Sequence, residues 1–436
     1  MTAPRPTFGL PEDLARKLGF TLLALVIYRV GAHIFAPGVN AQAISDFIRT
    51  SAAAGFFNLY DTLGGGLSRA TVFALGIMPY ISASIIFQLA GGIVPSVGKM
   101  QKEEEGRKKL TQWTRYLTIV IAVSQAWTFA LFTESIPGAV PAPTLWTRLT
   151  MVTALTTGAI FVMWLGEQIT ERGIGNGMSL MITFSILDRL WPGLFHMLQL
   201  WQQGTYTFGK ILFFLAVLVA VIAAVTAMHL AARRIPVQIP RKVIGRGRMT
   251  QGQKTFIPIR LITAGVMPIV FAQTIMIVPL TLASFTQVGW VRALSDFFAV
   301  GELPYNVTFF VLILLFSYFY TSIIFNSVDL AENLKKQGGF IPGVKPGAAT
   351  ADYIDSVLGK VTLPGAVFLG LVAIVPVLLN TKLGIQQAVG GTSVLIVVGV
   401  LLDTIAQVQQ HLTLRKYDSF MKSGRIKFRG RQQRFM

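Results

Sequence analysis

The sequence contains no cysteine, which excludes disulfide bridges and thiolate metal sites. It is also poor in charge, because Asp, Glu, Lys and Arg make up only 13% of its 436 residues. Soluble chains usually carry about a quarter of such residues to cover their surface. Hydrophobic residues reach 53%, which is more than one aqueous core can bury in a chain this long. We therefore predict an all-α protein that crosses a membrane several times.

The signatures of enzymes and metal proteins are missing as well. The chain has no Gly-Lys-Ser/Thr phosphate-binding loop and no Gly-x-Ser-Gly nucleophile turn. The histidines are scattered, without the spacing of metal ligands: His33, His196, His229 and His411. These absences predict a protein that is not an enzyme and that binds neither a cofactor nor a metal.

Long apolar segments are abundant in the chain. A helix needs roughly 20 apolar residues to cross ~30 Å of hydrocarbon. Ten segments meet this requirement: 18–37, 72–94, 113–133, 149–166, 175–195, 211–232, 257–282, 304–325, 361–380 and 389–408. The first segment contains Arg29 and is too long for the core of a cleaved signal, so we expect a retained span.

The distribution of positive charge orients these spans. Ten spans place both ends of the chain on one side of the membrane. Most of the 38 Lys and Arg residues fall in the tails and loops of that side. Because positively charged loops stay in the cytoplasm, we expect a multi-pass protein of the cytoplasmic (inner) membrane with both termini in the cytoplasm.

The chain divides into two halves with five predicted spans each, residues 1–200 and 201–436. An odd number of spans per half means that the second half is inverted relative to the first. Gly76-Ile77-Met78-Pro79 in the second span is echoed by Gly265-Val266-Met267-Pro268 in the seventh. Glycine and proline weaken a helix, and helices interrupted at matching places in inverted repeats indicate a transport path. The alternative is a pair of ordinary proline kinks.

The predicted span centres carry no Asp, Glu, Lys or Arg apart from Arg29. A secondary transporter of a small solute, which is the alternative function, would normally place ionisable groups there. Aliphatic side chains such as Ile81, Ile182 and Ile396 could instead form a constriction that stops ions by dewetting and widens for a large passenger. Alternatively, these isoleucines only fill the core or face lipid.

Segment 40–71 is too polar and too short to span a membrane. Phe56, Phe57, Tyr60 and Leu63 share one helical face, and the glycines that follow form a hinge. We interpret the segment as a short re-entrant helix that can swing, with an amphipathic loop as the alternative.

Two basic loops are expected on the cytoplasmic side. Residues 233–260 alternate apolar and polar side chains around a glycine-rich centre, which predicts a protruding hairpin. Loop 327–360 contains Lys335, Lys336 and Lys345. Attraction to anionic lipids explains many of these charges, but the length of the hairpin favours docking to a polyanion or an acidic protein.

Three long runs resemble the SecY family of bacterial protein-translocation channels. They are Phe73 to Ile86, Trp164 to Gly177 and Gly390 to Val398. The resemblance extends over nearly the whole chain. It implies two halves that open like a clamshell and a lateral gate between the second and seventh spans. The gate positions are Pro79, Ser82, Ile85, Gln88, Pro268 and Gln273.

The resemblance also implies a pore ring and a plug. The ring falls on Ile77, Ile81, Met178, Ile182, Val270 and Ile396. Met178 and Val270 depart from the usual isoleucine but remain apolar. The plug corresponds to about residues 57–68, including Phe57, Asn58, Leu59, Tyr60, Gly64, Gly65 and Gly66.

The partners implied by the resemblance are SecE, SecG, the SecA ATPase, the ribosome and signal-sequence-bearing preproteins. SecA and the ribosome would dock on the basic loops, at Arg241, Lys242, Arg246, Arg248, Lys254 and Lys345. Lys345 replaces the family's arginine, so it keeps the charge but loses the planar, bidentate fork.

Overall fold

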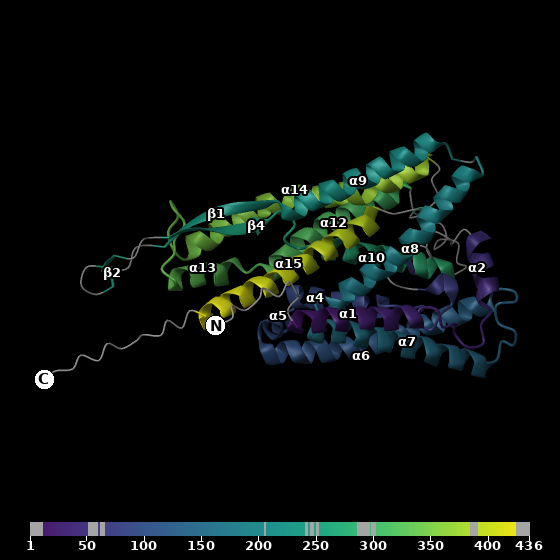
Figure 1. The fold of residues 1–436 in the computed structure, drawn as a ribbon. Coiled ribbons are helices and arrows are strands. Elements are labelled where there is room, and N and C mark those ends of the chain that lie inside the picture. Colours follow the sequence, from purple (N-terminus) through teal and green to yellow (C-terminus); the bar gives the residue numbers. More distant parts are fainter. Residues whose placement is uncertain are drawn as a thin grey trace, which may run out of the picture.

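The computed structural model describes residues 12–50, 60–61, 66–204, 206–239, 243–244, 248–249, 253–285, 297, 302–383 and 391–423. Among these residues, ten long helices each overlap one of the predicted spans (Figure 1). They are α1 (Glu12–Gly31), α4 (Met78–Ile93), α6 (Glu104–Glu134), α7 (Leu145–Arg172), α8 (Gly177–Gln202), α9 (Phe208–Leu230), α10 (Met267–Phe285), α12 (Leu303–Ile324), α14 (Ala348–Leu383) and α15 (Gly391–Ser423). The predicted helical architecture is therefore confirmed.

Length and composition alone identify fewer spans. Six helical segments of the described residues are long and apolar enough to cross a membrane, namely those that contain α6, α7, α9, α12, α14 and α15. Helix α4 and the following α5 (Pro95–Lys102) are bent by 109° and give a seventh if they count as one span. The number of ten spans stays a prediction.

The helices of the two predicted halves form two neighbouring layers (Figure 1). Helices α1, α4, α6 and α7 contact one another in one layer, and α9, α10, α12, α14 and α15 contact one another in the other. Helix α4 touches α10, and α8 touches α1, α7 and α15. The contacts between helices of the two halves therefore include α4 with α10, which carry the repeated Gly-x-Met-Pro motif, and α8 with α15.

That motif begins each helix and does not interrupt it, which corrects the expectation of a broken span. Residues 72–77 and 261–266 form turns, and α4 and α10 start at Met78 and Met267. Gly76 and Gly265 have φ angles of 52° and 61°, a left-handed conformation that glycine adopts without strain. The proline that follows each methionine lies in the first turn, where its missing N–H costs no hydrogen bond.

The basic loop at 233–260 folds as the predicted hairpin. Strand β1 (Ala232–Ile239) pairs antiparallel with β4 (Gln253–Arg260), and the short strands β2 (Val243–Ile244) and β3 (Arg248–Met249) pair beyond them. The hairpin projects from one end of the molecule, and α2 (Ala41–Thr50) lies at the opposite end (Figure 1). Helix α15 ends on the hairpin side.

Glycines allow helices and turns to approach closely within the first layer. A Cβ atom added at Gly158 of α7 would overlap the carbonyl oxygen of Val72 in the turn before α4. Gly19 of α1 meets no atom within 4 Å and serves as the comparison. Gly158 therefore lets α7 support the start of α4.

We expect Gly158→Ala to lower the free energy of unfolding by about 1–3 kcal/mol, because overpacking forces the Val72 backbone to move. Gly19→Ala should leave it unchanged or raise it by about 0.5–1 kcal/mol through helix propensity. Thermal unfolding of the purified protein in detergent measures both. Equal stability of the two variants would contradict the close approach.

Candidate functional site

The predicted ring residues lie on four helices that come from both halves. Ile77 and Ile81 lie at the start of α4, Met178 and Ile182 on α8, Val270 on α10 and Ile396 on α15. All except Met178 are buried, with exposed fractions of 6% or less, and belong to one continuous apolar cluster. Met178 is partly buried against this cluster, and its sulfur lies beside Gly166 of α7. The structure therefore collects the six side chains in an apolar interior.

Two polar cavities lie on opposite sides of Ile182 along α8. One, of about 330 Å³, is lined by Asn176 and Ser179 at the start of the helix. The other, of about 40 Å³, is lined by Ser185 and Asp188 further along. Six residues of helix separate Ser179 from Ser185, which corresponds to about 9 Å. The apolar layer between the two cavities is therefore only two helical turns thick.

The ring positions on the other helices fit the same layer. Met267 of α10 and Val400 of α15 line the larger cavity, together with Arg260 and Asp403, whose side chains are 3.6 Å apart. Val270 and Ile396 lie about one helical turn away from these lining residues on the same two helices. Helices α8, α10 and α15 thus each place an apolar side chain about one helical turn away from a residue that lines the larger cavity.

The predicted gate residues lie on two helices that contact each other, α4 and α10. Pro79, Ile85 and Pro268 are buried, whereas Ser82 is half-buried. Gln88 of α4 donates a hydrogen bond from its amide nitrogen to the Ser84 hydroxyl at 2.9 Å. Helices α4 and α10 are therefore neighbours, as a gate between them requires.

Gln273 of α10 differs from the other gate residues in its polar contacts. Its side chain is 1% exposed, yet neither its amide oxygen nor its amide nitrogen bonds to any residue that the structure describes. A buried amide without partners costs free energy in this arrangement of the helices.

The predicted plug lies partly outside the described residues. Phe57, Asn58, Leu59, Gly64 and Gly65 lie outside them. Tyr60 and Gly66 are described, and Tyr60 is 5% exposed.

The Tyr60 hydroxyl donates to the Leu75 carbonyl at 3.3 Å and lies 3.4 Å from Oε1 of Gln125. Burial raises the pKa of the Tyr60 hydroxyl, so it remains a neutral donor. Tyr60 of the predicted plug is therefore anchored in the first half, close in sequence to Ile77 of the predicted ring through its bond to Leu75.

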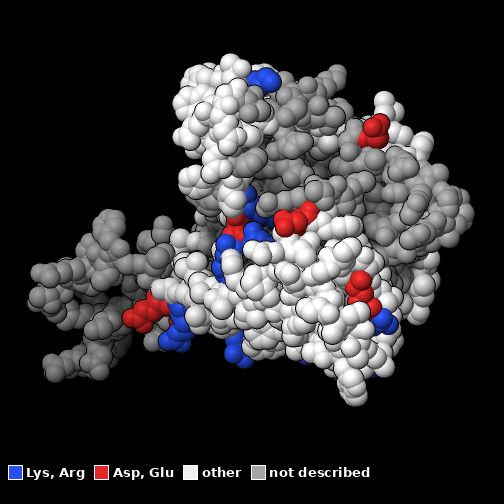
Figure 2. Space-filling view, turned by 90° about the vertical axis from the view of Figure 1, so that its right-hand side faces the viewer, with Lys and Arg blue, Asp and Glu red and all other residues white. Residues whose placement is uncertain are grey.

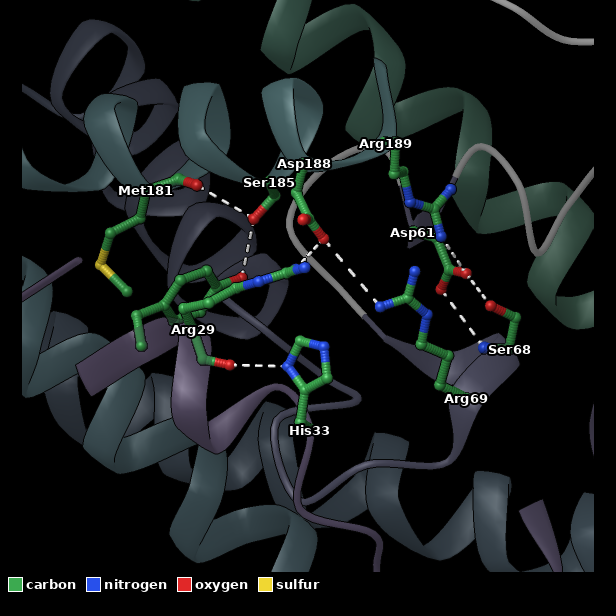
Figure 3. A network of polar contacts seen from close by, with 10 residues as sticks. Arg29, His33, Asp61, Ser68, Arg69, Met181, Ser185, Asp188 and Arg189 are labelled. Carbon is green, nitrogen blue, oxygen red and sulfur yellow. Dashed lines mark hydrogen bonds and ion pairs between the residues drawn. The ribbon is translucent and has the colours of Figure 1, made fainter. Parts of the chain in front are cut away.

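A polar network surrounds the smaller cavity and joins α1 and α8 to Asp61, Ser68 and Arg69 of the segment before α4 (Figure 3). Arg29 of α1 forms an ion pair with Asp188 of α8, and Arg69 reaches the same carboxylate at 4.0 Å. Next to it, Arg189 of α8 forms an ion pair with Asp61. Figure 2 shows basic and acidic side chains gathered in a hollow of the end of the molecule that carries α2.

This network corrects one sequence-based expectation. Arg29 was expected to be the lone ionisable residue at the span centres, but α8 continues to Gln202, so that Asp188 and Arg189 lie near its middle. The significance of Asp61 was also missed. The signal that could have revealed Asp188 is its opposite charge to Arg29 near the same predicted membrane depth.

The two basic loops form one platform at the hairpin end. Ile235, Val237 and Ile259 of the hairpin pack with Ile341 and Ile354 of the second loop and its following helix. Gln238 and Phe340 exchange two backbone hydrogen bonds of 2.9 Å. The loops are therefore positioned together.

The predicted docking residues occupy different parts of this platform. Arg248 lies in β3 and Lys254 in β4, whereas Arg241, Lys242 and Arg246 lie outside the described residues. Lys345 is exposed, and its carbonyl accepts a hydrogen bond from Thr350 at 2.9 Å. The Lys345 ammonium is thus presented to solvent on a fixed turn.

Comparisons with known proteins agree over nearly the whole chain. A family model described as SecY matches residues 71–405. The protein translocase subunit SecY of Streptomyces galbus is 41% identical over 441 residues, which cover 97% of this chain and 100% of that protein. The corresponding subunit of Escherichia coli (strain K12) is 38% identical over 429 residues, which cover 96% of each chain.

Solved structures share the fold at lower identity. A structure described as that of a protein conducting channel matches with a TM-score of 0.69 and 20% identity over 98% of both chains. A SecY structure, whose plug domain is described as stabilising the closed state and maintaining a membrane seal, matches with a TM-score of 0.66 and 19% identity. Sec61 in the canine ribosome-channel complex gives a TM-score of 0.64 and 19% identity. Each of the last two matches covers 98% of both chains.

We expect Gln273→Leu to raise the free energy of unfolding by about 1–3 kcal/mol, because it removes a buried amide that lacks partners. Gln88→Leu is the matched control, since it removes an amide that has a hydrogen-bond partner and should not stabilise the protein. Chemical or thermal unfolding in detergent compares the two variants. Destabilisation by Gln273→Leu would show that its amide has a partner that matters.

Proposed function

The chain belongs to the SecY family, and we propose that it is the central subunit of a channel that passes unfolded preproteins across the cytoplasmic membrane. The observation that carries this proposal is the thin apolar layer between two polar cavities. Water can fill a polar cavity, whereas a short aliphatic constriction stays dry and stops ions. A polypeptide can pass such a layer once the surrounding helices separate.

The lateral gate between α4 and α10 would release apolar segments into lipid. These helices touch each other and belong to different layers, so their separation would open the interior sideways. Burial of one apolar side chain is worth about 1.5–3 kcal/mol. A signal sequence or membrane segment that moves from the channel into lipid could therefore supply the free energy for opening.

The driving force for translocation comes from partners in this proposal. The basic platform formed by the two loops offers exposed charge, including Lys345, to ribosomal RNA or to the SecA ATPase. The match with Sec61 from a ribosome-channel complex supports the ribosome as a partner. SecE and SecG would clamp the two halves, and anionic lipids would contact the remaining positive loops.

The alternative function, secondary transport of a small solute, is not favoured. Ionisable residues do lie within the predicted spans, but Arg29 is paired with Asp188, and Arg189 is paired with Asp61. Both family membership and fold agree instead with a protein-conducting channel. Solute uptake by the purified chain in liposomes would reopen the alternative.

We expect a stalled preprotein to contact the constriction. Because the chain has no native cysteine, single cysteines at Ile81 and Ile182 can be crosslinked to a cysteine in the preprotein without background. Both positions should react efficiently. Val120 and Val219, each 64% exposed on an outer helix face, are the controls. Reaction at the controls but at neither isoleucine would rule out the proposed path.

We expect deletion of residues 57–66 to raise ion conductance of the resting channel, because the segment would no longer cover the apolar layer. Conductance across a planar lipid bilayer measures the leak. Comparison at equal amounts of inserted protein controls for expression. An unchanged resting conductance would refute the assignment of this segment as the plug.

A further inference from the structure

We propose that the ion pair between Asp61 and Arg189 is the latch that holds the plug in the closed position. This inference rests on the proposed function, because it requires the segment around Asp61 to move when the channel opens. Asp61 belongs to the proposed plug, whereas Arg189 belongs to α8, which also carries the ring residue Ile182. The pair therefore links the movable segment directly to the wall of the constriction.

The contacts of Asp61 indicate a site built for a carboxylate. Asp61 has an exposed fraction of 0%. The Ser68 hydroxyl and the Arg189 guanidinium both donate to its Oδ2, and the Ser68 backbone N–H donates to Oδ1 at 3.4 Å (Figure 3). A fully buried carboxylate is tolerated only when a positive charge and hydrogen bonds compensate it.

Arg189 lies on the same face of α8 as Ile182, closer to the C-terminal end of the helix. Ile182, Ser185 and Arg189 are spaced by three and then four residues, so they form one stripe along the helix. Seven residues separate Ile182 from Arg189, which corresponds to about 10.5 Å. Asp61, held by Arg189, therefore lies in the wall of the smaller cavity, about two helical turns from Ile182 along α8.

The neighbouring ion pairs keep Arg189 available for Asp61. Asp188 engages Arg29 and lies near Arg69, so two other arginines of the cavity have a carboxylate partner. The Tyr28 hydroxyl and the Ser185 hydroxyl are 2.8 Å apart and join α1 to α8 one turn away. The rim of the cavity is therefore held together without Asp61, and Asp61 can leave without dismantling it.

Burial makes the two partners unequal, and this inequality distinguishes a latch from a general stabilising contact. The Arg189 side chain is 31% exposed and can be hydrated if its partner is removed, whereas Asp61 is fully enclosed. Replacement of Arg189 by a neutral residue thus leaves the Asp61 carboxylate buried without a positive partner. Water can hydrate this carboxylate only when the plug leaves. Replacement of Asp61 by a neutral residue leaves only the Arg189 side chain without its partner, and that side chain is not fully buried.

The test compares Arg189→Gln, Asp61→Asn and the double variant in the complete channel with its partner subunits. Resting ion conductance in planar bilayers should rise at least about tenfold for Arg189→Gln, the size expected from the coupling of close charge pairs. Asp61→Asn should give a smaller rise. The double variant should return close to the wild-type conductance, because its buried carboxylate is gone.

A matched control exists in the ion pair between Arg148 of α7 and Glu134 of α6. It is also partly buried, with bonds of 2.9 Å and 2.6 Å, and neither residue lines the smaller cavity. Arg148→Gln removes the partner of a carboxylate that is mostly buried, with 15% exposure at Glu134, but leaves the proposed plug untouched. Its resting conductance should equal that of the wild type.

A second measurement follows the plug without relying on conductance. Export of a preprotein with a weakened signal sequence should improve in Arg189→Gln, since less free energy is then needed to open the channel. The double variant should lose this gain. If Arg189 only stabilised the fold, Arg189→Gln would lower export, and the addition of Asp61→Asn would not restore it.

The outcomes separate the latch from the plug itself. If deletion of residues 57–66 raises conductance and Arg189→Gln does not, the latch is refuted and the plug remains. If neither raises conductance, the plug assignment fails and the latch fails with it. Equal leaks in Arg189→Gln and Arg148→Gln would reveal general destabilisation and also overturn the latch.

Discussion

Exclusion of water by a thin layer of aliphatic side chains is the constraint on which the structure depends. Polar cavities lie on both sides of Ile182 along α8, and only about two helical turns separate their walls. So short a barrier can be crossed by an extended polypeptide without a long apolar passage. In the proposed channel, the layer would seal only while the four helices that contribute to it stay together.

The few charges near the smaller cavity do not conflict with the exclusion of water, because they are paired. Arg29, Asp188 and Arg189 would be costly in hydrocarbon as isolated ions, and each has a partner of opposite charge. The pairs also join segments that are far apart in the sequence, namely α1, α8 and the segment around Asp61. Charge pairing thus fixes the geometry at the rim of the cavity, whereas apolar contacts form the layer beneath.

The repeated Gly-x-Met-Pro motif gives α4 and α10, the helices of the proposed gate, the same start. A left-handed glycine ends a run of turns, and a proline in the first turn is tolerated where no helical hydrogen bond is needed. The start of α4 is supported from outside by Gly158 of α7, which allows the Val72 backbone to approach. The proposed gate needs helices whose ends are fixed but whose mutual contact can open, and the start of α4 is fixed in this way.

The sequence by itself determined the helical class, the approximate position of ten apolar segments and the hairpin at 233–260. These features follow from local hydrophobicity and from alternation along the chain, which need no partner. Only the tertiary structure decided that Asp188 engages Arg29, that Arg189 engages Asp61, and that Gln238 meets Phe340 in the second basic loop. These partners are far apart in the chain, so helix packing chooses them and no local pattern encodes them. The Gly-x-Met-Pro echo was visible in the sequence, but the left-handed φ at Gly76 and Gly265 that turns it into a helix start required the fold.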